Sequence, residues 1–191
     1  ASYESATSGV TVNLISTGSN EDTFSSIENL TGSNYADTLT GETHSNLLRG
    51  LDGNDILIGY GGGDAFEGGE GTDTVSYAWV NANTGVLASL ADQNANAGGA
   101  TGDTYSSIEK LIGSDGNDTL IGDSNASGNT LDGGAGSDLF VDGGGASADI
   151  YIGGTGADAI SYANASAAVT LSLSGGTSGD AAGDVYTSIE N

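Results

Sequence analysis

Residues 50–76 read GLDGNDILI, GYGGGDAFE and GGEGTDTVS, three nine-residue segments that follow one another without a gap. Each segment, here called a nonad, begins with Gly and has Asp at its sixth position and an apolar residue at its eighth. Side chains alternate between the two faces of a strand, so the eighth residue points inward when the seventh and ninth point outward. One apolar side chain per nonad cannot form a core, but stacked nonads can. The stretch therefore predicts a stack of short strands joined by glycine-rich turns.

The nonads fall into two blocks. The first block, residues 32–76, holds five nonads, and the second, residues 113–161, holds five more, of which two are eleven residues long. Asp occupies the sixth position in eight of the ten nonads, with Asn46 and Asn129 in the other two. The eighth position is apolar in all ten, a regularity that a disordered acidic linker would not show.

A longer repeat has a period of 81 residues, because the tripeptide Ser-Ile-Glu recurs at 26–28, 107–109 and 188–190. Alternating apolar stretches, such as Val10 to Leu14 and Val169 to Leu173, predict strands with one buried face. The chain starts and stops inside a unit, so we expect a fragment of a longer array. As one continuous solenoid it would consist of a partial joining segment (1–31), the first nonad block (32–76), a joining β segment (77–112), the second nonad block (113–161) and a partial joining segment (162–191).

The charge balance shows what the chain needs for folding. It carries 26 acidic side chains and two basic ones, Arg49 and Lys110, for a formal net charge of −24. Repulsion at this charge density opposes compaction, so a folded state requires cations from outside. Nucleic acid and anionic membrane surfaces are excluded as partners, because both are polyanions. The chain has no Cys for disulfides and no apolar run that would predict membrane insertion.

The turn of each nonad suits calcium. Glycine allows the positive φ angles that bring carbonyl oxygens close to an ion. Calcium takes six to eight hard oxygen ligands, and the turn offers both carbonyls and a carboxylate. Closely spaced carboxylates repel one another until a divalent cation joins them, so metal binding should contribute much of the folding free energy.

The nonads resemble the RTX (repeats-in-toxin, haemolysin-type) consensus Gly-Gly-x-Gly-x-Asp-x-apolar-x. The resemblance implies an all-β fold, a right-handed parallel β-roll (a β-solenoid) with calcium ions in the turns. Successive nonads would lie on opposite sides of the roll, with an ion between nonad n and nonad n+2. Each ion would take the second and fourth carbonyls and the Asp of one nonad, with the first and third carbonyls and the Asp of the next nonad on that side.

Four calcium sites follow from this mapping. Their ligand sets are Ser33 O, Tyr35 O, Asp37, Gly50 O, Asp52 O and Asp55; Leu51 O, Gly53 O, Asp55, Gly68 O, Glu70 O and Asp73; Ser114 O, Gly116 O, Asp118, Gly133 O, Ala135 O and Asp138; and Gly134 O, Gly136 O, Asp138, Gly153 O, Thr155 O and Asp158.

The two edges of the roll are unequal, since every departure in turn length or in the Asp falls in an even-numbered nonad. We expect a regular calcium ladder on the odd edge and weaker or altered binding on the even edge, at Asp64, Asp149, Asn46 and Asn129. Three aspartates recur with the 81-residue period and are either further calcium ligands or turn caps, namely Asp22, Asp103 and Asp184. The total is then about four to eight calcium ions.

No catalytic residue is predicted, because the single histidine, His44, lies in an irregular turn and the regular spacing accounts for the carboxylates. We expect a calcium-binding structural module of a secreted or cell-surface bacterial protein of adhesin, surface-layer or fibre type, exported by type I secretion and folding on calcium binding outside the cell. Its partners would be calcium and neighbouring repeats, with an extracellular surface or polysaccharide as a further candidate. The alternative is an accessory domain of a secreted protease, lipase or alginate epimerase that aids secretion, stability or polymer binding.

Overall fold

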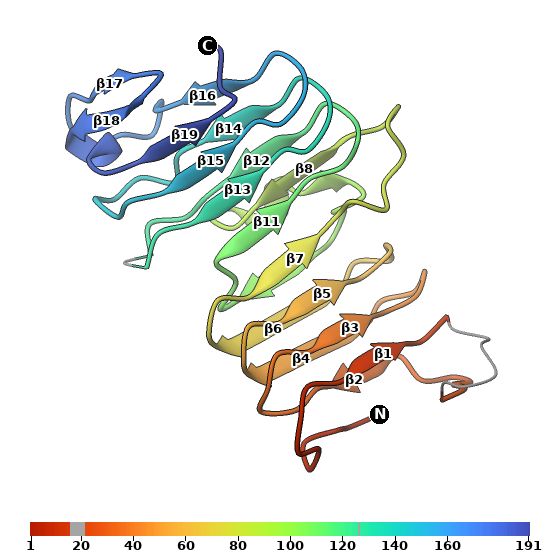
Figure 1. Cartoon of the computed structure of the whole chain (residues 1–191). Coiled ribbons are helices and arrows are strands. Elements are labelled where there is room, and N and C mark those ends of the chain that lie inside the picture. Colours follow the sequence, from red (N-terminus) through yellow and green to blue (C-terminus); the bar gives the residue numbers. More distant parts are fainter. Residues whose placement is uncertain (16–21, 126) are drawn as a thin grey trace. The chain divides into compact units, whose positions relative to one another are not determined.

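The computed structural model describes residues 1–15, 22–125 and 127–191 (Figure 1). Residues 16–21 of the predicted joining segment 1–31 and residue 126 of the second nonad block lie outside the described residues. The chain divides into two compact units, which are described separately below. Unit 1 comprises residues 1–76 and 100–108, and unit 2 comprises residues 77–99 and 109–191.

Unit 1 contains two rows of parallel strands. The first row is β1 (Thr11–Asn13), β3 (Thr38–Thr40), β5 (Ile56–Ile58) and β7 (Thr74–Ser76). The second row is β2 (Asn29–Thr31), β4 (Leu47–Asp52), β6 (Ala65–Glu70) and β10 (Thr104–Ser106). Consecutive nonads place their strands in alternate rows, so nonad n pairs with nonad n+2 (Figure 1).

Unit 2 repeats this arrangement. One parallel row is β11 (Lys110–Ile112), β13 (Thr130–Asp132), β15 (Ile150–Ile152) and β19 (Val185–Thr187). The other is β8 (Val86–Ser89), β12 (Thr119–Ile121), β14 (Leu139–Val141) and β16 (Ala159–Ser161). The parallel rows and the almost complete lack of helix among the described residues confirm the all-β fold class and the parallel β-roll.

The core of each unit is built from the eighth residues of the nonads. In unit 1 these side chains stack in register, with Leu57 facing Leu39 and Val75 on neighbouring strands. Phe66 stacks on Tyr105 with ring centroids 5.8 Å apart. All five are at most 9% exposed, as the alternation of faces predicts. Ile160, the last of the series in unit 2, is only half-buried.

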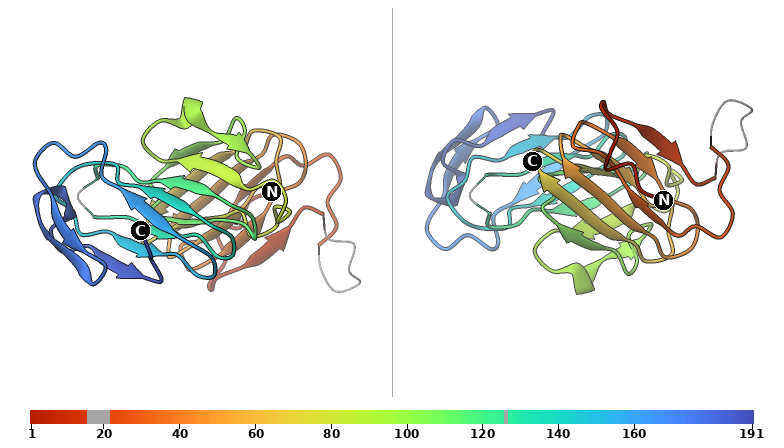
Figure 2. Two further views of the ribbon diagram at one scale, coloured as in Figure 1. Left: turned by 90° about the horizontal axis from the view of Figure 1, so that it is seen from above. Right: turned by 90° about the horizontal axis from the view of Figure 1, so that it is seen from below.

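Parts of the joining segments add strands to the parallel rows, and other parts form antiparallel pairs outside them. β9 (Ala97–Gly98) pairs antiparallel with β8, and β17 (Thr170–Ser172) forms an antiparallel hairpin with β18 (Gly175–Ser178). Two short 3-10 helices, η1 (Gln93–Ala95) and η2 (Gly179–Ala181), also lie in these segments, and the loop that carries η1 projects from the strand rows of unit 2 (Figure 2).

One sequence prediction about these segments is wrong. Val12 and Leu14 are buried as expected, at 5% and 8% exposure, but Leu171 and Leu173 are 42% and 56% exposed. The reason is that β17 pairs with β18 as a hairpin instead of joining a parallel row, so its alternating residues do not face a stacked core.

Candidate metal centres

Acids at the sixth nonad position form rows along each unit. The backbone N–H of Asp37 donates to Oδ1 of Asp55, and the N–H of Asp55 donates to Oδ1 of Asp73, both at 2.8 Å. We call these three residues the odd row of unit 1, because they come from its first, third and fifth nonads. The hydrogen bonds fix each carboxylate beside the acid of the next odd nonad.

The odd row of unit 2 ends in a residue from outside the nonads. Asp118 N–H donates to Asp138 Oδ1, Asp138 N–H to Asp158 Oδ1, and Asp158 N–H to Oε2 of Glu190, each at 2.8 Å. Sequence reasoning did not assign a site role to Glu190. The signal that could have found it is the 81-residue recurrence of Ser-Ile-Glu, in which the acid is retained each time.

The even nonads form a second row in each unit. In unit 1, Asn46 N–H donates to Asp64 Oδ1 and Asp64 N–H to Asp103 Oδ1, both at 2.8 Å. In unit 2, the matching donors and acceptors are Asn129 to Asp149 at 2.7 Å and Asp149 to Asp184 at 2.9 Å.

Two of the three aspartates with the 81-residue period, Asp103 and Asp184, therefore occupy row positions like those of nonad aspartates. The third, Asp22, is exposed and accepts a hydrogen bond from Tyr3 Oη at 2.8 Å. This contact, burial and the charge of Asp22 raise the pKa of Tyr3 to about 12, with burial the largest cause.

Several row carboxylates are buried with one oxygen lacking a donor. Asp55, Asp64, Asp138 and Asp158 are at most 2% exposed, and within the described residues no hydrogen-bond donor reaches their Oδ2 atoms. Burial raises the pKa of Asp55 to about 6 and that of Asp64 to about 7, with repulsion from neighbouring acids adding to both. A buried carboxylate oxygen of this kind is costly unless a proton or a cation meets it.

The first-position glycines form the space into which these oxygens point. A Cβ atom built on Gly50 would collide with Asp55 Oδ2 and would lie 2.7 Å from the carbonyl oxygen of Gly68. A Cβ on Gly113 would meet Asp118 Oδ2 and the carbonyl of Gly133 in the same way. The Asp of nonad n and the first carbonyl of nonad n+2 therefore converge on one small space.

Carbonyls at the second and fourth positions also point from one rung to the next. A Cβ on Gly69 would collide with the carbonyl of Leu51, and one on Gly71 would collide with that of Gly53. Gly69 and Gly71 have φ angles of 119° and 148°, values that side chains rarely permit. Leu51 adopts φ 87° without being glycine, which indicates a strained turn.

Some predicted ligand carbonyls already accept backbone hydrogen bonds between rungs. Glu70 O accepts from Gly53 N–H at 2.9 Å, and Gly134 O accepts from Thr155 N–H at 3.0 Å. A carbonyl oxygen has two lone pairs, so one accepted hydrogen bond leaves it able to bind a cation. The other predicted carbonyls lie in the same turns, at Ser33, Tyr35, Gly50, Asp52, Ser114, Gly116, Ala135, Gly136, Gly153 and Thr155.

The first nonad of each block differs from the later odd nonads. Asp37 Oδ2 accepts from Ser33 N–H at 2.5 Å, and its Oδ1 accepts from Ser33 Oγ at 2.8 Å and Val10 N–H at 2.7 Å. Asp118 has the same contacts with Ser114 and Val86. Protein donors thus engage both oxygens of these two carboxylates.

The first residue of the even row is an asparagine in each unit. Asn46 Oδ1 accepts from Glu42 N–H at 2.6 Å, while its Nδ2 donates to the carbonyl of Glu28 at 2.8 Å. Asn129 Oδ1 accepts from Asp123 N–H at 2.7 Å, and its Nδ2 donates to the Asp123 carboxylate at 3.4 Å. At both positions the amide nitrogen donates to an oxygen, a contact that a carboxylate could not make.

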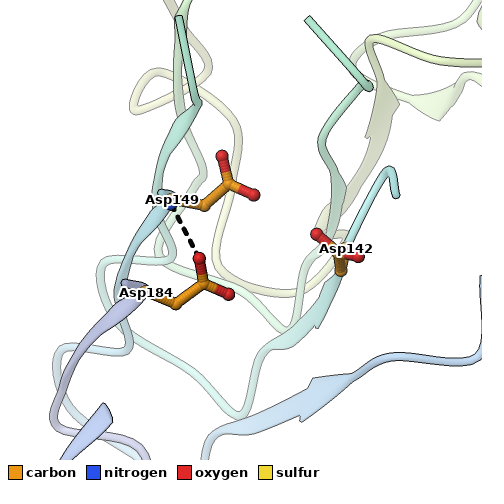
Figure 3. A group of neighbouring side chains, drawn as sticks. All are labelled: Asp142, Asp149 and Asp184. Atoms are coloured by element: carbon orange, nitrogen blue, oxygen red, sulfur yellow. Dashed lines mark hydrogen bonds between the residues drawn. The ribbon is translucent and has the colours of Figure 1, made fainter. Parts of the chain in front are cut away.

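Asp142, Asp149 and Asp184 form a buried group of carboxylates whose oxygens lie within 4.8 Å of one another (Figure 3). Asp142 takes the place of the first-position glycine in its nonad, a feature that sequence reasoning did not use. Tyr151 Oη lies 3.3 Å from both Asp142 Oδ1 and Asp149 Oδ2, and Tyr162 Oη donates to Asp184. Burial raises the pKa of Asp149 to about 6, so the group favours shared protons or a cation.

Comparison with protein families gives a match to the RTX calcium-binding nonapeptide repeat, in four copies over residues 40–75 and 103–140. The chain carries RTX repeats. The first range lies within the first nonad block, and the second begins at Asp103 and ends at Phe140, in the third nonad of the second block. A comparison with curated proteins gave no match.

RTX repeats bind calcium, so this chain is a calcium-binding structural module. The donor-free carboxylate oxygens and the converging carbonyl oxygens are hard ligands of the kind that calcium prefers. The first-position glycines leave space beside these oxygens. RTX repeats occur in secreted bacterial proteins. Within the described parts of the chain, no helix has the length and apolar character needed to cross a membrane.

Proposed function

We propose that the chain is a calcium-loaded structural repeat module of a secreted or cell-surface bacterial protein of adhesin, surface-layer or fibre type. It folds when exported protein meets extracellular calcium, and it then acts as a rigid spacer. The observation that carries this proposal is the buried Oδ2 of Asp55, which lacks a hydrogen-bond donor among the described residues and faces the carbonyl of Gly68 across a glycine-lined space.

The protein's own cations do not neutralise the rows. Arg49 Nε lies 2.6 Å from the carboxylate of Glu67, and Lys110 Nζ lies 4.0 Å from that of Asp132. Neither acid belongs to a row, so the formal charge of −24 leaves the row carboxylates to be balanced from outside. A divalent cation between successive acids removes the repulsion that would otherwise oppose stacking.

Calcium would act by joining rungs n and n+2. In the proposed odd sites of unit 1, Asp37 and Asp55 serve one ion and Asp55 and Asp73 serve the next. Ligands from two rungs come together only in the folded chain, so binding and folding are coupled. Extracellular calcium modules bind in the range of about 0.1 to 1 mM. The chain would thus stay unfolded at cytosolic calcium and fold outside the cell.

Far-ultraviolet circular dichroism tests this proposal. The chain is titrated from chelator to about 10 mM calcium, and the titration is repeated with magnesium. We expect a cooperative, calcium-selective gain of β signal, because magnesium is smaller and dehydrates reluctantly. A chain that is fully folded in chelator, or that ignores calcium, would contradict the proposal.

Small-angle scattering tests the spacer role on the same samples. The chain in calcium should have a smaller radius of gyration than in chelator, where it should approach the larger dimensions of an unfolded chain. Equal dimensions in both conditions would show that calcium does not build the rigid form.

A further inference from the structure

The Ser of the Ser-Ile-Glu tripeptide has nearly the same φ angle at each of its three occurrences. Ser26, Ser107 and Ser188 have φ angles of 56°, 52° and 52°, in the left-handed region that residues other than glycine rarely adopt. A strained conformation that recurs at the same motif is held by surrounding contacts. In unit 2, those contacts involve the last nonad of the second block, residues 153–161.

Glu190 sits where the next nonad's aspartate would sit. Asp158 N–H donates to Glu190 Oε2 at 2.8 Å, the same distance at which Asp138 N–H donates to Asp158 Oδ1 one rung earlier. Glu190 N–H in turn donates to the carbonyl of Asp158 at 3.0 Å. The longer glutamate side chain thus brings a carboxylate to the end of the odd row from a segment that is no nonad.

Ser188 supplies the matching carbonyl. A Cβ atom on Gly153 would collide with the carbonyl oxygen of Ser188 and lie 2.5 Å from Asp158 Oδ2. Around Gly50, the same space is bordered by the carbonyl of Gly68 and by Asp55 Oδ2. The left-handed φ of Ser188 therefore turns its carbonyl to the place taken by a first-position glycine carbonyl in a nonad.

One buried oxygen faces this place without a donor. Asp158 is fully buried, its Oδ1 accepts from Asp138 N–H at 2.8 Å, and its Oδ2 has no hydrogen-bond donor within the described residues. A buried carboxylate oxygen without a donor is costly, and a cation bound beside it would remove this cost. Ile189 is 7% exposed, so its buried side chain anchors the tripeptide between the two oxygen donors.

Unit 1 contains the corresponding pair of oxygens. A Cβ on Gly68 would collide with the carbonyl of Ser107 and lie 2.5 Å from Asp73 Oδ2. Ser107 belongs to the second copy of the tripeptide. The second and third copies of the tripeptide therefore place a Ser carbonyl beside a row aspartate in the same way.

We propose that Ser188 O and the Glu190 carboxylate complete a calcium site with Asp158 at the end of the odd row of unit 2. In three residues, the tripeptide supplies the carbonyl and the carboxylate that a nonad turn supplies in six. The site rests on the proposed calcium function and extends it, because it lets a row of nonads end on a bound ion. Without such an ion, the buried carboxylate of Asp158 in the last nonad would lack a positively charged partner.

Calcium stoichiometry of the whole chain, measured by equilibrium dialysis, tests the site. Glu190→Gln keeps the size of the side chain and its acceptor oxygen but removes the charge that holds the ion. We expect the variant to bind about one calcium ion fewer per chain than the unaltered protein, since ligand charge sets affinity. Glu4→Gln is the control, because Glu4 is exposed and contacts Ser2 Oγ away from the rows. Equal stoichiometry in Glu190→Gln and the control would overturn the site.

A second measurement does not depend on the folding of a variant. Carbon-13 NMR of the unaltered chain follows the Ser188 carbonyl and the Glu190 carboxylate during a calcium titration. We expect both signals to shift and saturate with calcium. Calcium binding that leaves both signals in place would overturn this site alone, whereas failure to bind any calcium would overturn the proposed function as well.

Discussion

The backbone N–H of Asp64 donates a 2.8 Å hydrogen bond to Oδ1 of Asp103, although 39 residues separate the two. Asp64 belongs to a nonad and Asp103 to the joining segment. The joining segment therefore contributes an acid to the even row of unit 1 in the same way as a nonad does, and Asp64 Oδ2 remains free of donors among the described residues.

Replacing Asp103 by Asn should weaken calcium binding at the end of this row. The amide oxygen can still accept from Asp64 N–H, but the charge that a calcium ion needs is lost. We expect about one ion fewer per chain by isothermal titration calorimetry. Asp22→Asn is the matched control, since Asp22 has the same place in the 81-residue repeat but is exposed and bonded to Tyr3. A larger effect from the Asp22 variant would refute the assignment of Asp103 to the row.

Asp55→Asn should impair calcium binding more than Asp37→Asn. Asp55 would serve two ions and has a donor-free Oδ2, whereas Asp37 would serve one and is already engaged by Ser33 and Val10. Charge count sets calcium affinity, so we expect Asp55→Asn to lose up to about two ions and Asp37→Asn at most about one. Calorimetric titration of both variants decides this, and equal losses would count against the shared role of Asp55.

The nonad spacing predicts the directions of most row and core side chains, because these directions are set within each nonad. Residues at the sixth and eighth positions have fixed directions once the strand at positions seven to nine forms, so the buried Leu57 and the row member Asp55 follow from position alone. The presence of both rows and their unequal regularity could be read in the same way, since Asn46 and Asn129 mark the even edge.

Contacts between distant segments could not be predicted in the same way. Glu190 enters the odd row of unit 2 from 32 residues away, and its role depends on a left-handed Ser188 that no spacing rule indicates. Asp142 joins Asp149 and Asp184 because it stands at the buried first position of its nonad, where the other nonads have glycine. Leu171 was misassigned because alternation alone cannot distinguish a stacked strand from a hairpin.

In chelator, the folded fraction of the chain should be larger at mildly acidic pH than at neutral pH. The folded-state pKa values of Asp55 and Asp138 are raised from 3.8 to about 6, and that of Asp64 to about 7, mainly by burial. A raised folded-state pKa means that the folded state binds protons more tightly, so its contribution is complete below about pH 4 and is lost as pH rises through 6 to 7.

Far-ultraviolet circular dichroism in chelator checks this pH dependence. We expect more β signal at pH 5 than at pH 8, where the calcium-free chain is expected to be unfolded. Asp64→Asn should reduce the difference, because it removes the carboxyl with the highest of these pKa values. A β signal that increases from pH 5 to pH 8 would show that the row carboxylates are not the groups that govern stability without calcium.

The stacked core should tolerate changes on one strand face only. Leu57 is fully buried and pairs with Leu39 and Val75, whereas its neighbour Ile56 is 41% exposed on the opposite face. Leu57→Ala leaves a cavity between rungs and should lower the free energy of unfolding by about 2 to 5 kcal/mol. Ile56→Ala should change it by less than about 1 kcal/mol, since an exposed strand position contributes little more than β propensity. Urea unfolding measures the free energy of unfolding of both variants. It is done at about 10 mM calcium, which is above the affinity range of extracellular modules. Similar losses in the two variants would mean that the eighth positions do not form the core, and the register of the whole stack would then be in question.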